Sequence, residues 1–177
     1  MRRFIAILTL IGATAAACGG STTDPGVERS VSAAPVAPPT GEVVLTISGD
    51  DARSNVGDQV QMDLEGLEAL GVVTETIFEP FVSEEVVMTG VPLVDVLRAA
   101  GIGEDTPLVW TALDDYQVSY TLGELMADDG LLATRLDGEP IPVSSGGPIR
   151  VVFRNLDGPI GRNTNQWIWS LATIEAG

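Results

Sequence analysis

Apolar and polar residues alternate along several short stretches of this chain, a pattern that predicts strands with one buried face. Other stretches are rich in β-branched residues, which also favour strands. Together these stretches cover 42–48, 59–62, 72–78, 85–89, 107–113, 117–120, 131–136, 149–154 and 166–175. The pattern therefore predicts a domain made mostly of short strands.

Short helices are predicted between these strands. Asp63 precedes leucines at helical spacing and is expected to cap a first helix. Pro92 is expected in the first turn of a second helix over 91–100, and Thr121 with Glu124 forms a capping box before a third. The predicted buried face of the second helix consists of Leu93, Val96, Leu97 and Ala100. Without regular strand–helix–strand spacing, this mixture indicates an α+β fold, β-rich with short helices.

The first 17 residues differ from the rest of the chain. A short basic start is followed by an apolar run over 4–17 that ends in Ala15–Ala17 and Cys18. The run is shorter than the roughly 20 residues that cross a membrane, and its small-residue end is typical of a signal peptide. The segment resembles a bacterial lipobox, which implies cleavage before Cys18 and lipidation of its thiol. The alternative is ordinary signal-peptidase cleavage that leaves a free thiol, and both place the mature chain outside the cytoplasm.

Three segments are therefore expected. Residues 1–17 form a lipoprotein signal peptide, residues 18–41 hold the lipidated Cys18 and a flexible linker, and residues 42–177 form one domain. The linker is rich in Gly, Ser, Thr, Ala and Pro, so it lacks the apolar surface needed to fold by itself. The lipid would anchor the protein to a membrane facing the periplasm or the cell exterior.

The amino-acid composition excludes several kinds of catalytic and metal site. The chain has one cysteine, no histidine and no lysine, which excludes zinc sites of His and Cys, Ser-His-Asp and Cys-His nucleophiles, Schiff-base lysines and disulfides. The formal charge of −16 becomes −18 when Arg2 and Arg3 leave with the signal peptide. Such an acidic chain does not suit nucleic acid or anionic lipid headgroups. A basic protein partner or a small neutral ligand remains possible.

Five short motifs follow one another in a characteristic order. They are Gly90–Leu93, Asp115–Val118, Leu131–Thr134 with Asp137–Pro142, Gly146–Arg150 and Trp167–Ile174. This order resembles the molybdopterin-binding domain of the sulfite oxidase family, over about Val43 to Glu175. The resemblance implies the mixed, β-rich fold of that family and a site for a pterin cofactor.

Catalytic members of that family ligate molybdenum through a cysteine thiolate some dozen residues before the Gly-x-Pro-Leu helix. The corresponding position here is near Phe78, and the stretch 74–89 has no cysteine. Molybdenum is therefore not expected, and no catalytic or metal-ligating residue is predicted. The chain is similar to small exported proteins of this fold that bind reduced pterins. Those proteins report to membrane-bound signalling enzymes that make or break cyclic di-GMP.

A pterin is flat, with a donor–acceptor edge, and is expected to stack on aromatic rings and meet a few polar groups. The candidates for stacking are Phe78, Phe81, Tyr116 and Trp167, and those for the polar edge are Asp115, Arg150, Arg162 and Asn165. The resemblance favours Arg150, because family members place a cofactor-contacting arginine at the end of this Gly-Gly-Pro-x-Arg motif.

Each candidate also has a purely structural interpretation. Arg150 could pair with an acid on the surface, Asp115 could form a turn, and Trp167 and Trp169, predicted on one strand face, could belong to the core. Three functions therefore remain open. The chain is a pterin-binding module that signals to a membrane protein, a molybdenum oxidoreductase without the usual cysteine, or an interaction protein that has lost the pocket.

Overall fold

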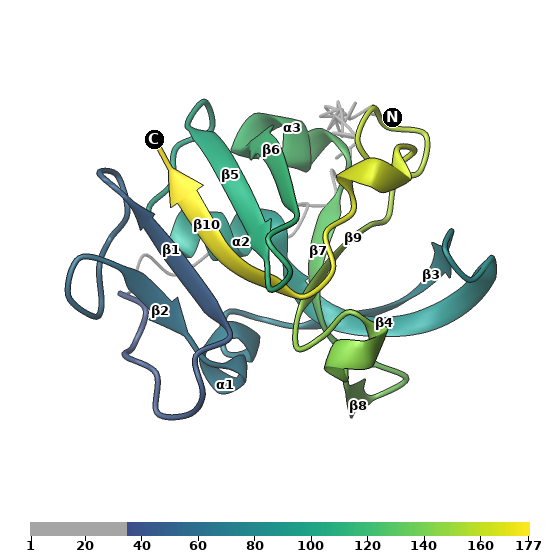
Figure 1. Cartoon of the computed structure of the whole chain (residues 1–177), viewed down its shortest axis with the longest axis horizontal. Coiled ribbons are helices and arrows are strands. Elements are labelled where there is room, and N and C mark those ends of the chain that lie inside the picture. Colours follow the sequence, from purple (N-terminus) through teal and green to yellow (C-terminus); the bar gives the residue numbers. More distant parts are fainter. Residues whose placement is uncertain (1–34) are drawn as a thin grey trace, which may run out of the picture. The chain divides into compact units, whose positions relative to one another are not determined.

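The computed structural model describes residues 35–177, and Figure 1 shows their arrangement. The predicted signal peptide, Cys18 and most of the predicted linker lie outside the described residues. Over residues 35–177, no helix has the length and hydrophobicity needed to cross a membrane.

One of the two sheets has five strands in the order β2-β1-β10-β5-β6. The strands are β1 (Leu45–Gly49), β2 (Val60–Met62), β5 (Pro107–Ala112), β6 (Gln117–Thr121) and β10 (Leu171–Ala176). Strands β1 and β10 run parallel, and the other neighbours are antiparallel. The last strand of the chain thus lies in the middle of this sheet, between the first strand and the β5–β6 hairpin.

The other sheet is antiparallel and contains the order β3-β4-β7-β8, with β9 also pairing with β7. Its strands are β3 (Val73–Glu79), β4 (Glu84–Pro92), β7 (Gly130–Leu136), β8 (Glu139–Pro140) and β9 (Arg150–Phe153). Strands β3 and β4 form a long hairpin that curves away from β7 (Figure 1). Strands β7 and β9 are buried along most of their length.

The helices are short, and the first and third are capped as predicted. They are α1 (Leu64–Glu68), α2 (Leu93–Ala99) and α3 (Leu122–Ala127), with 3-10 turns η1 (Val143–Ser145) and η2 (Thr164–Gln166). Asp63 accepts a hydrogen bond from the Gly66 amide, and Thr121 and Glu124 form the capping box. The four residues predicted for the buried face of α2 are all fully buried. Helix α2 packs against β4, β7 and α3.

The prediction of a β-rich fold with few short helices is confirmed. Helix α2 and strand β8 differ from the prediction. Helix α2 begins at Leu93, because Val91 and Pro92 still pair with β7 as the end of β4. Strand β8 escaped prediction because it has only two residues, held to β7 by the Asp137–Gly138 turn.

The predicted strand over 166–175 is wrong in its first half. Regular pairing starts at Leu171, and the residues before it form η2 and an irregular segment. Ser170 has a φ of 48°, and its amide donates to the carbonyl oxygen of Gly146 while its own carbonyl accepts from Leu113. These loop hydrogen bonds take Trp167 and Trp169 out of the sheet and into a loop.

The end of the predicted linker packs against the domain. Val36 is buried in the core, and the side-chain amide of Asn55 donates to the carbonyl of Ala37 at 3.0 Å. The amides of Thr40 and Gly41 both donate to the carboxylate of Asp63. Residues 36–41 therefore pack as part of the domain, whereas the sequence predicts its start at residue 42.

Gly90 tests how closely β4 and β7 approach each other. A Cβ added there would lie 2.3 Å from the carbonyl oxygen of Leu132, which is backbone and cannot rotate away. We expect Gly90→Ala to lower the free energy of unfolding by about 1–3 kcal/mol, the usual range for overpacking. In the matched control Gly123→Ala, the added Cβ meets only ordinary contacts inside α3. That variant should keep or gain up to about 1 kcal/mol through helix propensity. Urea unfolding measures both, and equal midpoints would contradict the close approach.

Acid should destabilise the domain through Glu68 of α1. Hydrogen bonds from the Arg135 guanidinium, helped by the Thr134 hydroxyl, hold the pKa of Glu68 below its usual value, against the opposing effect of burial. A lowered pKa in the folded state stabilises the protein above the ordinary glutamate value of 4.5, and this contribution disappears as the pH falls through the lowered pKa. Unfolding free energies measured between pH 6 and 2 should fall less steeply for Glu68→Gln than for the parent. The exposed Glu65→Gln on the same helix should keep the parental slope.

Candidate functional site

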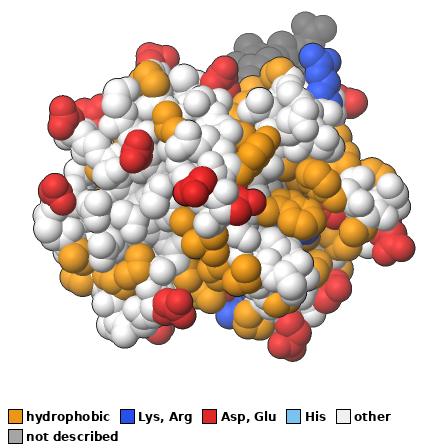
Figure 2. Space-filling model, viewed as in Figure 1, with side chains coloured by type: hydrophobic (Ala, Val, Ile, Leu, Met, Phe, Trp, Pro, Cys, Tyr) orange, Lys and Arg blue, Asp and Glu red, His pale blue; other side chains and the backbone are white. Residues whose placement is uncertain are grey.

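Hydrophobic side chains gather right of centre on the face shown in Figure 2, beside the β3–β4 hairpin. A hollow of about 310 Å³ lies there. We call it the aromatic hollow, and its walls include Phe81, Asp114, Tyr116, Asn165, Trp167 and Trp169. These residues come from the tip of the β3–β4 hairpin, the β5–β6 turn and the loop before β10, so the hollow is built by segments far apart in sequence.

Trp169 is the central ring of the site. The ring of Phe81 meets it edge-on with centroids 5.1 Å apart, and the guanidinium carbon of Arg150 lies 5.0 Å from its centroid. Gly146, with a φ of 84°, lies against the same ring, and a Cβ there would come within 2.8 Å of it. The Gly-Gly-Pro-x-Arg motif therefore supplies both the close backbone approach and the cation that hold Trp169.

Two tyrosines of the β5–β6 hairpin donate hydrogen bonds to the loop that carries Trp167, the second tryptophan of the hollow. The hydroxyl of Tyr116 donates to the carbonyl of Asn165 at 2.5 Å, and that of Tyr120 donates to the carbonyl of Gln166. Burial raises the pKa of Tyr120, so its hydroxyl stays protonated and keeps donating. Tyr116 is half exposed and forms part of the wall of the hollow.

The buried carboxylate of Asp128 holds the same loop from the opposite side. One of its oxygens accepts hydrogen bonds from the backbone amides of Ile160 and Gly161. The carbonyl of Gly161 in turn accepts from the indole nitrogen of Trp167 at 2.9 Å. Trp167 is consequently fixed by a short chain of hydrogen bonds that starts at the end of α3.

Arg150 and Glu79 form a buried ion pair under the site. Arg150 Nη2 lies 2.5 Å from Glu79 Oε2, and the two side chains are only 5% and 2% exposed. Loss of hydration lowers the pKa of Arg150, and the nearby Glu79 carboxylate opposes this effect. Another Arg150 nitrogen donates to the Ser145 carbonyl at 3.3 Å, whereas Nε has no hydrogen-bond partner among the described residues.

The predicted site residues divide into two groups. Phe81, Tyr116, Asn165 and Trp167 meet in the aromatic hollow. Arg150 lies next to it, in an adjoining hollow of about 370 Å³ that shares Trp169.

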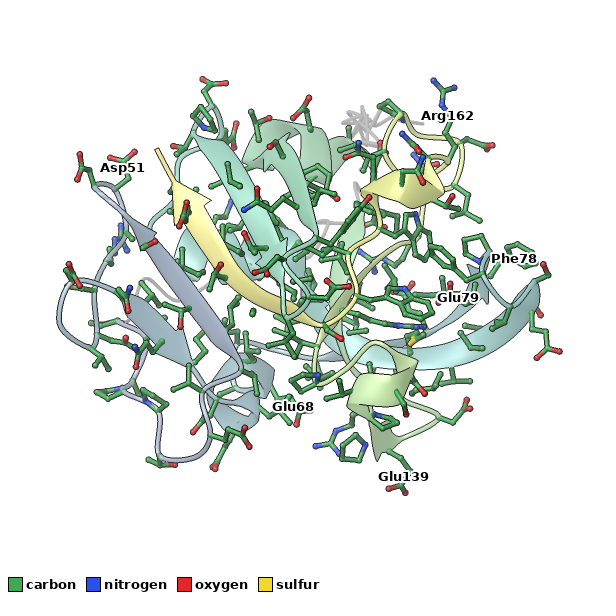
Figure 3. The ribbon with its side chains drawn as sticks, in the orientation of Figure 1. Asp51, Glu68, Phe78, Glu79, Glu139 and Arg162 are labelled. Atoms are coloured by element: carbon green, nitrogen blue, oxygen red, sulfur yellow. The ribbon has the colours of Figure 1, made fainter. Side chains whose placement is uncertain are left out.

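The remaining predicted residues lie elsewhere. Asp115 has a φ of 66° in the β5–β6 turn, and its neighbour Asp114 lines the hollow instead. Phe78 points outward from β3, opposite to Glu79 (Figure 3). Arg162 is exposed and points away from the domain in the same view. The structure does not bring Asp115, Phe78 or Arg162 into the aromatic hollow.

Sequence reasoning did not select Glu79, Asp114 or Trp169. The alternation of β3 carries a signal for Glu79, because it shares a strand face with the buried Ile77. Trp169 was assigned to the core because its strand was overextended. Nothing in the sequence separates Asp114 from Asp115, since both lie in one short turn and only the backbone path decides which carboxylate faces the hollow.

These features define a β-rich domain with a small aromatic hollow formed by its loops. A sequence model of the family described as oxidoreductase molybdopterin binding domain matches residues 55–176. The chain belongs to this family, which confirms the resemblance predicted from the order of its motifs. A search of curated proteins found no match.

The donor set around the hollow does not fit a protein-ligated molybdenum centre. The domain has no cysteine or histidine, and across residues 35–177 no cluster of three or more carboxylates could hold a metal ion. Phe78, near the position of the family's thiolate, is 45% exposed on the outward face of β3. Arg150, the cation nearest the site, is already neutralised by Glu79. Neither a soft metal ligand nor an arginine is among the residues that line the aromatic hollow.

A double-mutant cycle tests the ion pair. Removing one partner leaves a buried charge uncompensated, so Glu79→Leu or Arg150→Met alone should lower the free energy of unfolding by about 3–5 kcal/mol. The double variant replaces the pair by apolar side chains and should recover most of that loss. Chemical unfolding measures all three. Single variants as stable as the parent, or a double variant as unstable as the sum of the singles, would contradict a buried pair.

Proposed function

We propose that this protein is an exported lipoprotein that binds a reduced pterin without transforming it and signals occupancy to a membrane protein. Membership of the molybdopterin-binding family supports the pterin part of this proposal. The sequence around Cys18 supports the anchor.

The aromatic hollow is the observation that carries the proposal. Its volume of about 310 Å³ lies at the lower end of the range for small-molecule sites, and its rings converge from three loops. Phe81 stands edge-on to both Trp167 and Trp169, at 6.1 and 5.1 Å between centroids. A flat ligand gains contact area from such rings.

Asp114 supplies the polar edge. The 2-amino group and the neighbouring ring N–H of a pterin are adjacent donors, and a carboxylate accepts two such hydrogen bonds side by side. One oxygen of Asp114 accepts the Tyr116 amide at 3.3 Å, which fixes the carboxylate at the wall of the hollow and leaves further lone pairs for a ligand.

The charges around the hollow favour an unphosphorylated pterin. Phosphate groups need cations or the N-termini of helices. The walls hold Asp114, and the adjoining hollow holds Glu79, Glu84 and Arg150, whose charge is balanced by Glu79. The absence of a thiolate, an imidazole or a lysine from the domain supports binding without catalysis.

The direct test is chemical analysis of the lipoprotein purified from the cells that make it. After oxidation, the extract should show pterin fluorescence, and its mass spectrum should match an unphosphorylated pterin. Metal analysis of the same sample should find molybdenum in less than a few percent of the molecules. Stoichiometric molybdenum would instead favour an oxidoreductase. No released pterin, together with no binding heat on adding pterins to stripped protein, would favour an interaction protein.

Two pairs of variants locate the site by calorimetry with a reduced pterin. Asp114→Asn should weaken binding roughly 10–100-fold, the usual effect of losing a charged hydrogen-bond acceptor, whereas Asp115→Asn in the same turn should have no effect. Phe81→Leu should weaken binding about 3–10-fold through loss of an aromatic contact, whereas the outward Phe78→Leu should not. If the two variants of either pair changed the affinity for the pterin equally, the ligand would not bind in the aromatic hollow.

A further inference from the structure

A second hollow of the described domain is a groove of about 600 Å³. We call it the docking groove. Its apolar walls include Val43, Val44, Leu64, Leu113, Val143 and Leu171. Val43, Leu113 and Val143 are 40%, 58% and 64% exposed, which places them among the large hydrophobic side chains left open to solvent. Hydrophobic side chains below the middle of the face in Figure 2 belong to this region.

The charged residues that line the groove are all acidic. They are Glu42, Asp63 and Glu65, and no arginine lines it. The Asp63 carboxylate is occupied, since it accepts the amides of Thr40, Gly41 and Gly66. Glu42 and Glu65 are exposed and have no ion-pair partner among the described residues. The groove therefore combines apolar walls with two free negative charges.

The docking groove is continuous with the aromatic hollow. Leu113 and Val143 also line a middle hollow of about 420 Å³, whose other walls include Asp114 and Trp169. Asp114 and Trp169 in turn line the aromatic hollow. A ligand that moves the β5–β6 turn would consequently move Leu113, which the docking groove shares with the middle hollow.

We propose that the docking groove binds an extended segment of a membrane protein, with apolar side chains in the groove and arginine or lysine against Glu42 and Glu65. This proposal rests on the membrane partner of the proposed function. Charge complementarity favours a basic segment as the occupant of this acidic groove. A second copy of this chain, with a formal charge of −16, would bring acid against acid, and anionic lipid headgroups are repelled in the same way.

The course of the chain supports a partner in the same membrane. One wall of the groove is the segment 40–44, which begins 22 residues after Cys18. If Cys18 carries the lipid, the 18 residue steps from Cys18 to the buried Val36 can span at most about 60 Å. The groove would then stay within reach of the external part of a neighbouring membrane protein.

Site-directed photo-cross-linking tests the proposal in the cells that make the full-length protein. A benzoylphenylalanine residue replaces Val143 at the groove or, as the control, Met126, which is 44% exposed on α3. We expect an adduct from Val143 and none from Met126. Sequencing of the cross-linked peptide should show a membrane-protein segment in which arginine or lysine lies beside apolar residues.

Charge reversal completes the test. Glu42→Arg combined with Glu65→Arg should lower the yield of the Val143 adduct at least tenfold. The control Asp58→Arg with Asp157→Arg makes the same charge change at exposed positions outside the groove and should leave the yield unchanged. The docking proposal would be overturned by the absence of an adduct, or by an adduct with a second copy or a lipid. It would also be overturned if charge reversal at Glu42 and Glu65 left the yield of the adduct unchanged. The pterin content of the same samples separates the two proposals. A normal pterin content without an adduct would overturn only the docking proposal. An adduct without pterin would overturn only the proposed ligand.

Discussion

The buried ion pair between Arg150 and Glu79 is the constraint on which the site depends. It connects β9 with β3, which are separated in the sheet by β7 and β4, so it holds the curved β3–β4 hairpin over the body of the domain. Four residues further along the chain, Arg154 makes a similar ion pair with Glu75 of β3. Because the charges of Arg150 and Glu79 are removed from water, each requires the other. The hairpin tip that carries Phe81 is thereby placed against the two tryptophans.

The same pair sets the chemistry of the site. An arginine at the end of the Gly-Gly-Pro-x-Arg motif could have met a phosphate, but here its charge is balanced from inside the protein and its plane supports Trp169. The cation of this motif therefore stabilises the fold. What remains open to a ligand is an aromatic surface with carboxylates near it, and this combination favours a neutral heterocycle with donor groups along one edge.

The sequence predicted the strands, the helix caps and the family because these depend on local pattern and on motif order. It also selected four of the residues that meet in the aromatic hollow. It failed where tertiary contacts overrule the local pattern. The predicted strand over 166–175 is too long, because the Ser170 amide donates to the Gly146 carbonyl and the Ser170 carbonyl accepts from Leu113, which bends the chain at Ser170. Val36 was assigned to a linker because its composition is that of a flexible segment, and only the three-dimensional fold shows that it is buried.

The arrangement of the hollows explains how a small site could control a larger surface. The sheets carry the ion pair, whereas the ligand would meet loop residues that are held by side-chain hydrogen bonds, such as that from the Tyr116 hydroxyl to the carbonyl of Asn165. Loops of this kind shift at lower free-energy cost than packed strands do. Asp114 and Trp169 each line both the aromatic and the middle hollow, and Leu113, next to Asp114 in the chain, lines the docking groove. A small movement of this turn would therefore reach the groove without any change in the sheets, which is the coupling that a binding protein needs in order to report its ligand.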